Sequence, residues 1–351
     1  MGSPPPPSAS EARRAPPLRI VFMGTPALAA HILERMVAAA GADFMVAGVV
    51  TRPDQPRKRG LKLEPSEVGA VAARAGLPTL KPVKIRTPEF LAELNSLAPD
   101  LLVVAAYGRI LPNPVLNAPR LMPINVHASL LPRHRGAAPI EGAILAGDPE
   151  SGVTIMRVVE RMDAGPILLQ RAIALAPDET QGTLKEKLAE LGAQALLEAI
   201  AQFRNGTIVE EPQDENLATY TAPIKKEHAA INWSADATHI ERMVRAYDPW
   251  PVARTTIGGE ELLIWRARVV ADDTVTDGAR DARDMDDARV GGPSDVAAAP
   301  GTITRMQPAP VIKCGAGSLA LIEVQAPSRR RMAAADYLRG RRVAAGARLG
   351  G

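Results

Sequence analysis

The order of segments over residues 18–50 constrains the fold most strongly. A short apolar run, residues 18–23, ends at a Gly-Thr-Pro turn. This pattern predicts a strand and then a helix to about residue 39, because Pro26 fits the first turn of a helix. A second apolar run spans residues 44–50. Strand, glycine turn, helix and strand in this order predict the start of a doubly wound α/β domain.

Later segments continue this alternation through residue 205. Apolar runs typical of buried parallel strands alternate with segments of helical spacing. We expect strands at residues 100–105, 123–126, 152–158 and 167–175, and helices at residues 139–146 and 183–203. The pattern predicts a Rossmann-like, doubly wound domain over residues 18–205.

A second, smaller domain is expected after a linker at residues 206–224, which lacks periodicity and contains glycine and prolines. A chain of 351 residues is long enough for two domains. We expect a helix at 237–246 and short strands at 253–257, 262–267, 301–305, 311–314 and 318–324. Short strands with turn signals predict a small β-barrel, OB-like, over residues 225–351.

Two segments are expected to be disordered. Residues 1–17 are rich in proline and serine and lack the apolar core of a signal peptide. Residues 271–300 hold eight Asp and three Arg, so this insert carries −5 and the rest of the chain +8. A basic body suits a polyanionic partner. No run approaches 18 apolar residues, so we expect no membrane span, and we expect a cytoplasmic protein.

Metal and disulfide chemistry have little support in the sequence. Cys314 is the single cysteine, which excludes a disulfide framework and a cysteine-based metal site. None of the five histidines forms an H-x-x-H or H-E-x-x-H pair, so no metal site is predicted. We expect a monomer.

The candidate chemistry lies at Asn125 and His127. These residues are two apart on a predicted strand, so both point to one face, near the carboxyl end where open α/β sheets place ligands. A carboxamide and an imidazole there could stabilise an oxyanion and move a proton in acyl transfer. Asp163 follows a later strand and could orient or charge the histidine. The alternative is that this pair is structural, and His134 is expected to be a solvated loop residue.

A longer match makes the interpretation specific. The stretches NVHASLLP (125–132), RGAAP (135–139), GVTIM (152–156) and MDAG (162–165) resemble the 10-formyltetrahydrofolate transformylase family. Further stretches resemble its methionyl-tRNA formyltransferase branch: GTP (24–26), TRPD (51–54), KRGLKL (58–63), AYGRILP (106–112), INW (231–233) and YDPWP (247–251). The resemblance runs from about residue 18 to the end, except for the insert.

The resemblance implies both the catalytic residues and the two substrates. Asn125, His127 and Asp163 would be catalytic, the formyl donor 10-formyltetrahydrofolate, and the acceptor the α-amino group of methionyl initiator tRNA. The folate would lie along Ser129, Leu130, Leu131 and Pro132 and against Tyr107, Gly108, Arg109, Ile110 and Leu111. The charged tRNA would contact Gly24, Thr25, Pro26, Arg57, Lys58, Arg59, Lys62, Lys225, Lys226 and Arg245. No metal is implied.

One departure affects the methionyl pocket. The family usually has an aromatic residue two positions after Pro26, whereas this chain has Leu28. Trp233, Trp250 and Trp265 are expected in the core or between domains.

Two alternatives come from other classes of protein, and a third comes from within the family. An NAD-dependent dehydrogenase shares the strand-helix pattern, but the sequence lacks G-x-G-x-x-G. A non-catalytic RNA-binding protein would not need the three candidate catalytic residues. A formyltransferase for a ribonucleotide or sugar amine would not need a basic, β-rich second domain.

Overall fold

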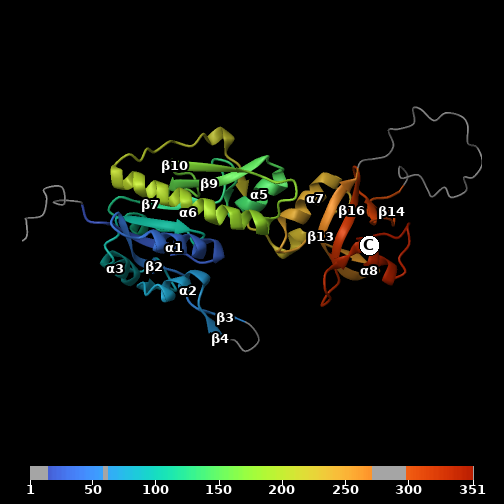
Figure 1. Ribbon diagram of the computed structural model, residues 1–351, viewed down its shortest axis with the longest axis horizontal. Helices are drawn as coiled ribbons and strands as arrows, with labels where there is room; N and C mark the ends of the chain where they lie inside the picture. Colours follow the sequence, from blue (N-terminus) through green and yellow to red (C-terminus); the bar gives the residue numbers. More distant parts are fainter. Residues whose placement is uncertain (1–14, 58–61, 271–297, 351) are drawn as a thin grey trace, which may run out of the picture. The chain divides into compact units, whose positions relative to one another are not determined.

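The computed structural model of the chain describes residues 15–57, 62–270 and 298–350. Most of the predicted tail and of the acidic insert therefore lies outside the described residues. The chain forms two compact units (Figure 1). Unit 1 comprises Met1–Gly136, Ser151–Ile173 and Lys185–Tyr220, and unit 2 comprises Ala137–Glu150, Ala174–Leu184 and Thr221–Gly351. Within the described ranges, no helix is both long and apolar enough to cross a membrane.

Unit 1 is built on a seven-stranded sheet with the order β10-β9-β7-β6-β1-β2-β5. The strands are β1 Leu18–Gly24, β2 Phe44–Val50, β5 Thr79–Leu80, β6 Leu101–Ala105, β7 Met122–His127, β9 Glu150–Arg157 and β10 Ile167–Ala174. β5, β2, β1, β6 and β7 run parallel, and β9 is antiparallel to β7. The chain winds outward from β1 in both directions, which confirms the doubly wound domain. The carboxyl ends of β1, β6 and β7 therefore meet at one edge of the sheet.

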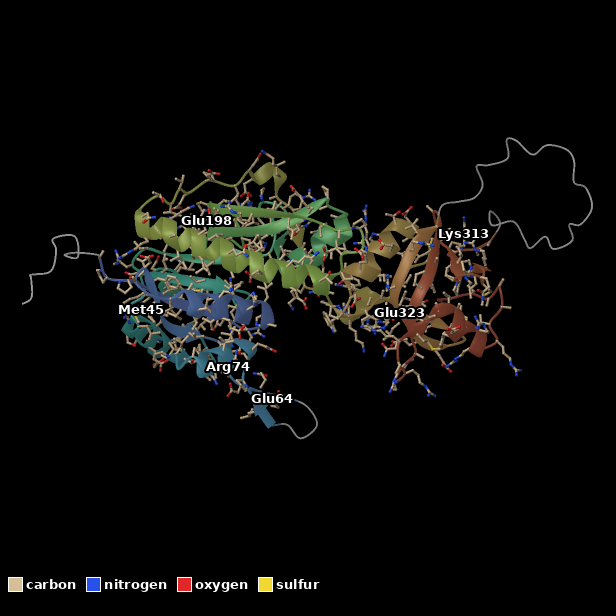
Figure 2. All side chains as sticks on the ribbon, viewed as in Figure 1. Met45, Glu64, Arg74, Glu198, Lys313 and Glu323 are labelled. Carbon is tan, nitrogen blue, oxygen red and sulfur yellow. The ribbon has the colours of Figure 1, made fainter. Side chains whose placement is uncertain are left out.

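Helices cover both faces of this sheet. They are α1 Ala27–Ala39, α2 Glu67–Arg74, α3 Pro88–Ser96, α4 Asn113–Leu116 and α6 Gln181–Asn205. α1 and α6 share a face: a Cβ on Gly192 of α6 would lie 3.1 Å from Val126 of β7 and 3.5 Å from Ile32 of α1. Arg171 of β10 also pairs with Glu198 of α6, which Figure 2 labels.

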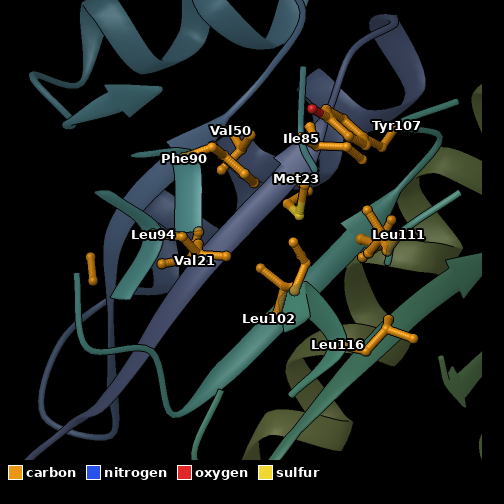
Figure 3. Packing of buried hydrophobic residues seen from close by; sticks show 13 residues of the cluster. Val21, Met23, Val50, Ile85, Phe90, Leu94, Leu102, Tyr107, Leu111 and Leu116 are labelled. Carbon is orange, nitrogen blue, oxygen red and sulfur yellow. The ribbon is translucent and has the colours of Figure 1, made fainter. Parts of the chain in front are cut away.

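The opposite face of the sheet packs against α3 and α4. Figure 3 shows Val21 and Leu102 of the strands in one buried cluster with Phe90 and Leu94 of α3 and Leu116 of α4. Successive side chains of a strand point to opposite faces, so each strand contributes to the packing on both faces of the sheet.

Local capping explains two helices that apolar spacing did not predict. The hydroxyl of Ser66 accepts from the Gly69 N–H at 2.9 Å at the start of α2. Thr87 accepts from the Phe90 N–H at 3.3 Å at the start of α3, whose first residue is Pro88. Both are N-cap arrangements that satisfy amide groups left without partners at a helix start.

The segment predicted as a linker forms paired structure. It contains the 3-10 turn η1, Glu215–Leu217, and the short strand β11, Tyr220–Thr221, which pairs with β8, Arg135–Gly136. A second short pair, β3 Gln55–Arg57 and β4 Lys62–Glu64, forms a hairpin.

Unit 2 contains an antiparallel sheet with the order β12-β13-β16-β15-β14, and β17 also pairs with β16. The strands are β12 Arg254–Ile257, β13 Glu260–Val270, β14 Ile303–Arg305, β15 Val311–Lys313, β16 Ser318–Gln325 and β17 Met332–Ala333. Its helices are α5 Pro139–Ala146, η2 Lys226–Ala229, α7 Ala237–Ala246 and α8 Ala334–Gly340.

The two edge strands of this sheet are joined by the end of the chain. Leu349 forms an antiparallel bridge with Ile257 of β12, and Arg348 forms one with Thr302, beside β14. The sheet thereby closes, which confirms the predicted small barrel. Trp233 and Trp265 are buried, whereas Trp250 is 56% exposed and so is not a core residue.

Candidate active site

Asn125 and His127 lie on β7 at the edge where the parallel strands end. Asn125 pairs in register with Val104 of β6 and Met156 of β9, and His127 pairs with Thr154 of β9. The His127 side chain is buried at 6% exposure. Asn125 is half-buried, and its carboxamide makes no hydrogen bond to another described residue. Its two donors are therefore available to a bound molecule.

Asp163 reaches the same place from a turn after β9. Its backbone is left-handed, with φ of +49°. One carboxylate oxygen accepts from the Gly136 N–H at 2.8 Å, and the other lies 3.8 Å from His127 Nδ1. That second distance exceeds a hydrogen bond, but it leaves both atoms within reach of one bridging water or substrate atom. The structure thus brings the three predicted catalytic residues together.

The second ring nitrogen of His127 faces the His134 carbonyl oxygen at 3.1 Å. His134 itself is only 7% exposed and has φ of +58°, and its N–H donates to Thr219 Oγ1 at 2.8 Å. The expectation that His134 is a solvated loop residue was therefore wrong. Its backbone serves the site, which the charged sequence around it did not indicate.

The backbone of the loop after β7 is held by hydrogen bonds to side chains of the loop itself and of β9 and β10. The Ser129 hydroxyl donates to the Arg133 carbonyl at 2.7 Å. Thr154 Oγ1 donates to the Ser129 carbonyl at 2.7 Å and accepts from the Leu131 N–H at 3.1 Å. Gln170 of β10 donates to the Leu131 carbonyl at 2.7 Å. Ser129 and Leu131 are buried, and Leu130 and Pro132 are half-buried.

The loop after β6 combines buried and exposed side chains. Tyr107 and Leu111 belong to the buried cluster of Figure 3, whereas Ile110 is 64% exposed. Burial raises the pKa of the Tyr107 phenol, against the opposing charges of Arg109 and Arg52. Its hydroxyl has no partner within the described residues.

The backbone of this loop is held by two arginines. Arg52 donates to the Gly108 carbonyl at 3.4 Å, and Gly108 has φ of +75°. Arg109 donates to the carbonyls of Pro82 at 3.2 Å and Val83 at 3.0 Å. An open hollow of about 340 Å³ borders these carbonyls, lined by Pro82, Val83, Lys84, Thr87, Glu89, Phe90 and Glu93.

The turn after β1 lies beside this loop. A Cβ on Gly24 would lie 2.9 Å from the Ala105 carbonyl, so only glycine permits this approach to β6. Thr25 Oγ1 donates to the Tyr107 carbonyl at 3.5 Å, and Pro26 precedes α1 as its N-cap. Leu28 is buried, 8% exposed, in the first turn of α1.

The predicted tRNA-binding residues fall into distinct settings. Arg57 and Lys62 pair across the β3–β4 hairpin, while Lys58 and Arg59 lie outside the described residues. Lys225 and Lys226 of unit 2 are exposed.

Arg245, by contrast, is engaged within unit 2. It binds both carboxylate oxygens of Glu241, at 2.6 and 2.9 Å, and donates to the Glu179 carbonyl at 3.0 Å. Its side chain is 19% exposed, so it is poorly placed to contact phosphate.

Several residues that hold the site were not predicted. Thr154 and Gln170 lie on strands whose polar, inward positions were hidden among apolar neighbours. Arg135 is fully buried, although arginine normally signals a surface position. Gln213 lies in the segment predicted as a linker. The described residues contain no group of three His, Cys, Asp or Glu side chains able to hold a metal ion.

The fold is that of a formyl transferase. Residues 18–200 match the family described as "Formyl transferase", and residues 223–342 match "Formyl transferase, C-terminal domain". Methionyl-tRNA formyltransferase of Methylococcus capsulatus is 44% identical over 95% of this chain and 100% of its own length. That of a Roseiflexus species is 45% identical over 95% of this chain and 96% of its own. The chain belongs to the methionyl-tRNA formyltransferase family.

Solved structures support the fold. An N-formyltransferase from Helicobacter canadensis, in complex with folinic acid and dTDP-3-aminofucose, has a TM-score of 0.61. It is 16% identical and covers 87% of this chain and 98% of its own. HypX from Aquifex aeolicus, in complex with tetrahydrofolic acid, has a TM-score of 0.54 at 17% identity, covering 92% of this chain and 47% of its own.

Proposed function

We propose that the chain transfers the formyl group of 10-formyltetrahydrofolate to the α-amino group of methionyl initiator tRNA. The observation that carries this proposal is the convergence of Asn125, His127 and Asp163 at one sheet edge in a member of this family. The chain matches its relatives over both domains, which favours their acceptor over a ribonucleotide or sugar amine.

The chemistry follows from the groups at the site. The neutral amine attacks the formyl carbon, a C–N bond forms, and the carbonyl oxygen becomes an oxyanion. Asn125 donates to this oxyanion, because its carboxamide has no competing partner in the part of the chain that the structure describes. The bond from the formyl carbon to N10 of the folate then breaks, and the proton lost by the amine reaches N10.

His127 and Asp163 stabilise charge at the site and transfer the proton that the amine loses. A protonated His127 ring donates from one nitrogen to the His134 carbonyl, and the Asp163 carboxylate lies 3.8 Å from the other nitrogen. That separation exceeds a direct hydrogen bond, so a water molecule or the substrate amine that contacts both groups passes the proton between them. Asp163 balances the imidazolium charge and accepts the amine proton, directly or through water.

The folate lies between the loops after β6 and β7. A flat pterin needs apolar walls and amide-like hydrogen bonds. Leu130 and Pro132 supply half-buried apolar surface, and the backbone of residues 107–111 supplies polar groups. Arg52 donates to the Gly108 carbonyl of this loop, and Arg109 ties the loop to the Pro82 and Val83 carbonyls.

The tRNA binds through Arg57, Lys58, Arg59 and Lys62 and through Lys225 and Lys226. Arg57 and Lys62 pair on adjoining strands of the β3–β4 hairpin, and the exposed Lys225 and Lys226 suit phosphate contacts. Arg245 has a role inside unit 2 instead. The protein acts as a cytoplasmic monomer, which size-exclusion chromatography with light scattering checks.

The test is a formylation assay with methionyl initiator tRNA and 10-formyltetrahydrofolate, run for the wild type and for His127→Ala and Asp163→Ala. We expect formylated product from the wild type and a kcat lower by about 10²–10³ in each variant, since an electrostatic group at the reacting centre is lost. Circular dichroism checks that the variants fold.

The control acceptors are free methionine and an amino sugar nucleotide. A wild type that formylates either of these, and not the tRNA, would contradict the proposed acceptor. A folded variant with more than about a tenth of the wild-type kcat would contradict the assigned residues.

A further inference from the structure

Residues 211–220, here called the strap, lie against the two loops that face His127. At one end, Glu211 and Ile167 exchange two backbone hydrogen bonds of 2.8 Å. At the other, the Thr219 carbonyl accepts from the Arg135 N–H at 2.9 Å. All these residues belong to unit 1. The strap is therefore part of the catalytic unit, although its sequence has no periodicity.

Gln213 joins the strap to the turn that carries Asp163. Its Nε2 donates to the carbonyls of Asp163 at 2.9 Å and Gly165 at 2.7 Å. Its Oε1 accepts from Arg135 Nε at 3.0 Å and Nη2 at 2.7 Å. The orientation of the amide is fixed by chemistry, because carbonyls only accept and a guanidinium only donates.

The Asp163 turn requires such support. A non-glycine residue with φ of +49° is sparsely populated and persists only where its surroundings hold it. Gln213 binds the carbonyls on both sides of residue 164, so it clamps the bend itself.

The strap also fixes the carboxylate of Asp163 through Arg135. The Arg135 side chain is fully buried and donates to Glu215 at 2.9 and 3.1 Å and to Tyr220 at 3.1 Å. The next residue, Gly136, donates its N–H to the Asp163 carboxylate. Gln213 therefore touches the backbone of Asp163 and the arginine beside its carboxylate partner.

We propose that Gln213 is a positioning residue that holds the Asp163 carboxylate opposite His127. The proposal rests on the proposed function and deepens it, since it assigns a catalytic task to a segment predicted as a linker. A competing explanation is that Gln213 only satisfies the buried guanidinium of Arg135.

Two substitutions separate these explanations. Gln213→Glu keeps an acceptor for Arg135 and strengthens that contact, but it places a carboxylate oxygen against the carbonyls of Asp163 and Gly165. Gln213→Leu removes both sets of hydrogen bonds. Gln202→Glu, on α6, is the matched control, because the Gln202 side chain makes no hydrogen bond to another described residue.

We expect Gln213→Glu to lower kcat by about 10- to 100-fold, because small displacements of a reacting group are costly. KM for tRNA and folate should stay within about threefold, since neither substrate loses a contact. Rates are normalised to the folded fraction from circular dichroism. In a His127→Ala background the same substitution should add little, because it acts through the His127–Asp163 pair.

The outcomes are distinct. An inactive wild type contradicts the proposed function. An active wild type with a folded Gln213→Glu variant above half its kcat overturns the positioning role. An equal loss in the His127→Ala background also overturns it. If Gln213→Glu does not fold, a folded Gln213→Leu variant above half the wild-type kcat overturns the proposal in the same way.

Discussion

Asn125, His127 and Asp163 reach the site by different physical means. Strand alternation puts Asn125 and His127 on one face of β7, whereas Asp163 depends on a left-handed turn and on the Gly136 amide. The first two positions depend on the local backbone. The third depends on contacts between residues far apart in the chain, so it is more sensitive to changes elsewhere.

The free carboxamide of Asn125 leads to a prediction for Asn125→Ala. We expect kcat to fall by about 10²–10³, because an oxyanion donor is lost. The melting temperature should change little, because no hydrogen bond to a described residue is lost. Steady-state kinetics and calorimetry measure both, with Asn95→Ala on the exposed surface of α3 as the control. Unchanged kcat would remove Asn125 from the mechanism.

At the scale of elements, the turn at residues 161–165 packs tightly against β9. A Cβ on Gly165 would lie 1.9 Å from the Arg157 carbonyl, which is backbone and cannot rotate away. Gly165→Ala should therefore shift the turn, cost about 1–3 kcal/mol of stability and lower kcat. Denaturant unfolding and the formylation assay measure these effects. Gly41→Ala, where a Cβ meets nothing within 4 Å, should leave both unchanged.

The stability that the strap gives to the fold should depend on pH, because Glu215 is ionisable. Hydrogen bonds from Arg135, and then Arg161, lower the pKa of Glu215. A carboxyl group with a lowered folded-state pKa stabilises the fold above its unfolded pKa of about 4.3, and this stability is lost as pH falls through the folded value. The wild type should therefore melt higher than Glu215→Gln at pH 7, and the difference should shrink below about pH 4. A constant difference in melting temperature would contradict this linkage.

Elements whose apolar spacing is strong were predicted well, and elements held by polar contacts were not. α5, α7 and β2 have the bounds that the sequence predicted, because buried apolar residues define them. The strap was predicted as a linker, since its partners lie about 50 to 85 residues away in sequence. The burial of Arg135 was missed for the same reason, because its side chain bonds to Glu215 and Tyr220 of the strap. The burial of His134 was missed too, since its N–H bonds to Thr219, 85 residues away in sequence.

At the scale of the whole molecule, the charge is unevenly distributed along the sequence. Residues 271–300 carry −5, so the rest of the chain carries +8. Charges on the body attract a polyanion before any specific contact forms, and salt screens this attraction. The exposed lysines of unit 2 and the internally paired Arg245 should then differ in their effect on tRNA binding.

The salt dependence of tRNA binding tests this difference. Replacing both Lys225 and Lys226 by glutamine should weaken binding and flatten the slope of log K against log salt concentration. Each lost phosphate contact flattens the slope by about 0.7 to 0.9. Arg120→Gln is the matched control, because Arg120 pairs with Asp100 at the amino-terminal edge of the unit 1 sheet.

Arg245→Gln should lower the melting temperature, because Arg245 binds Glu241 and the Glu179 carbonyl, and it should leave the slope unchanged. Filter binding at several salt concentrations measures the slopes. A double lysine variant with the wild-type slope would show that Lys225 and Lys226 do not contact phosphate.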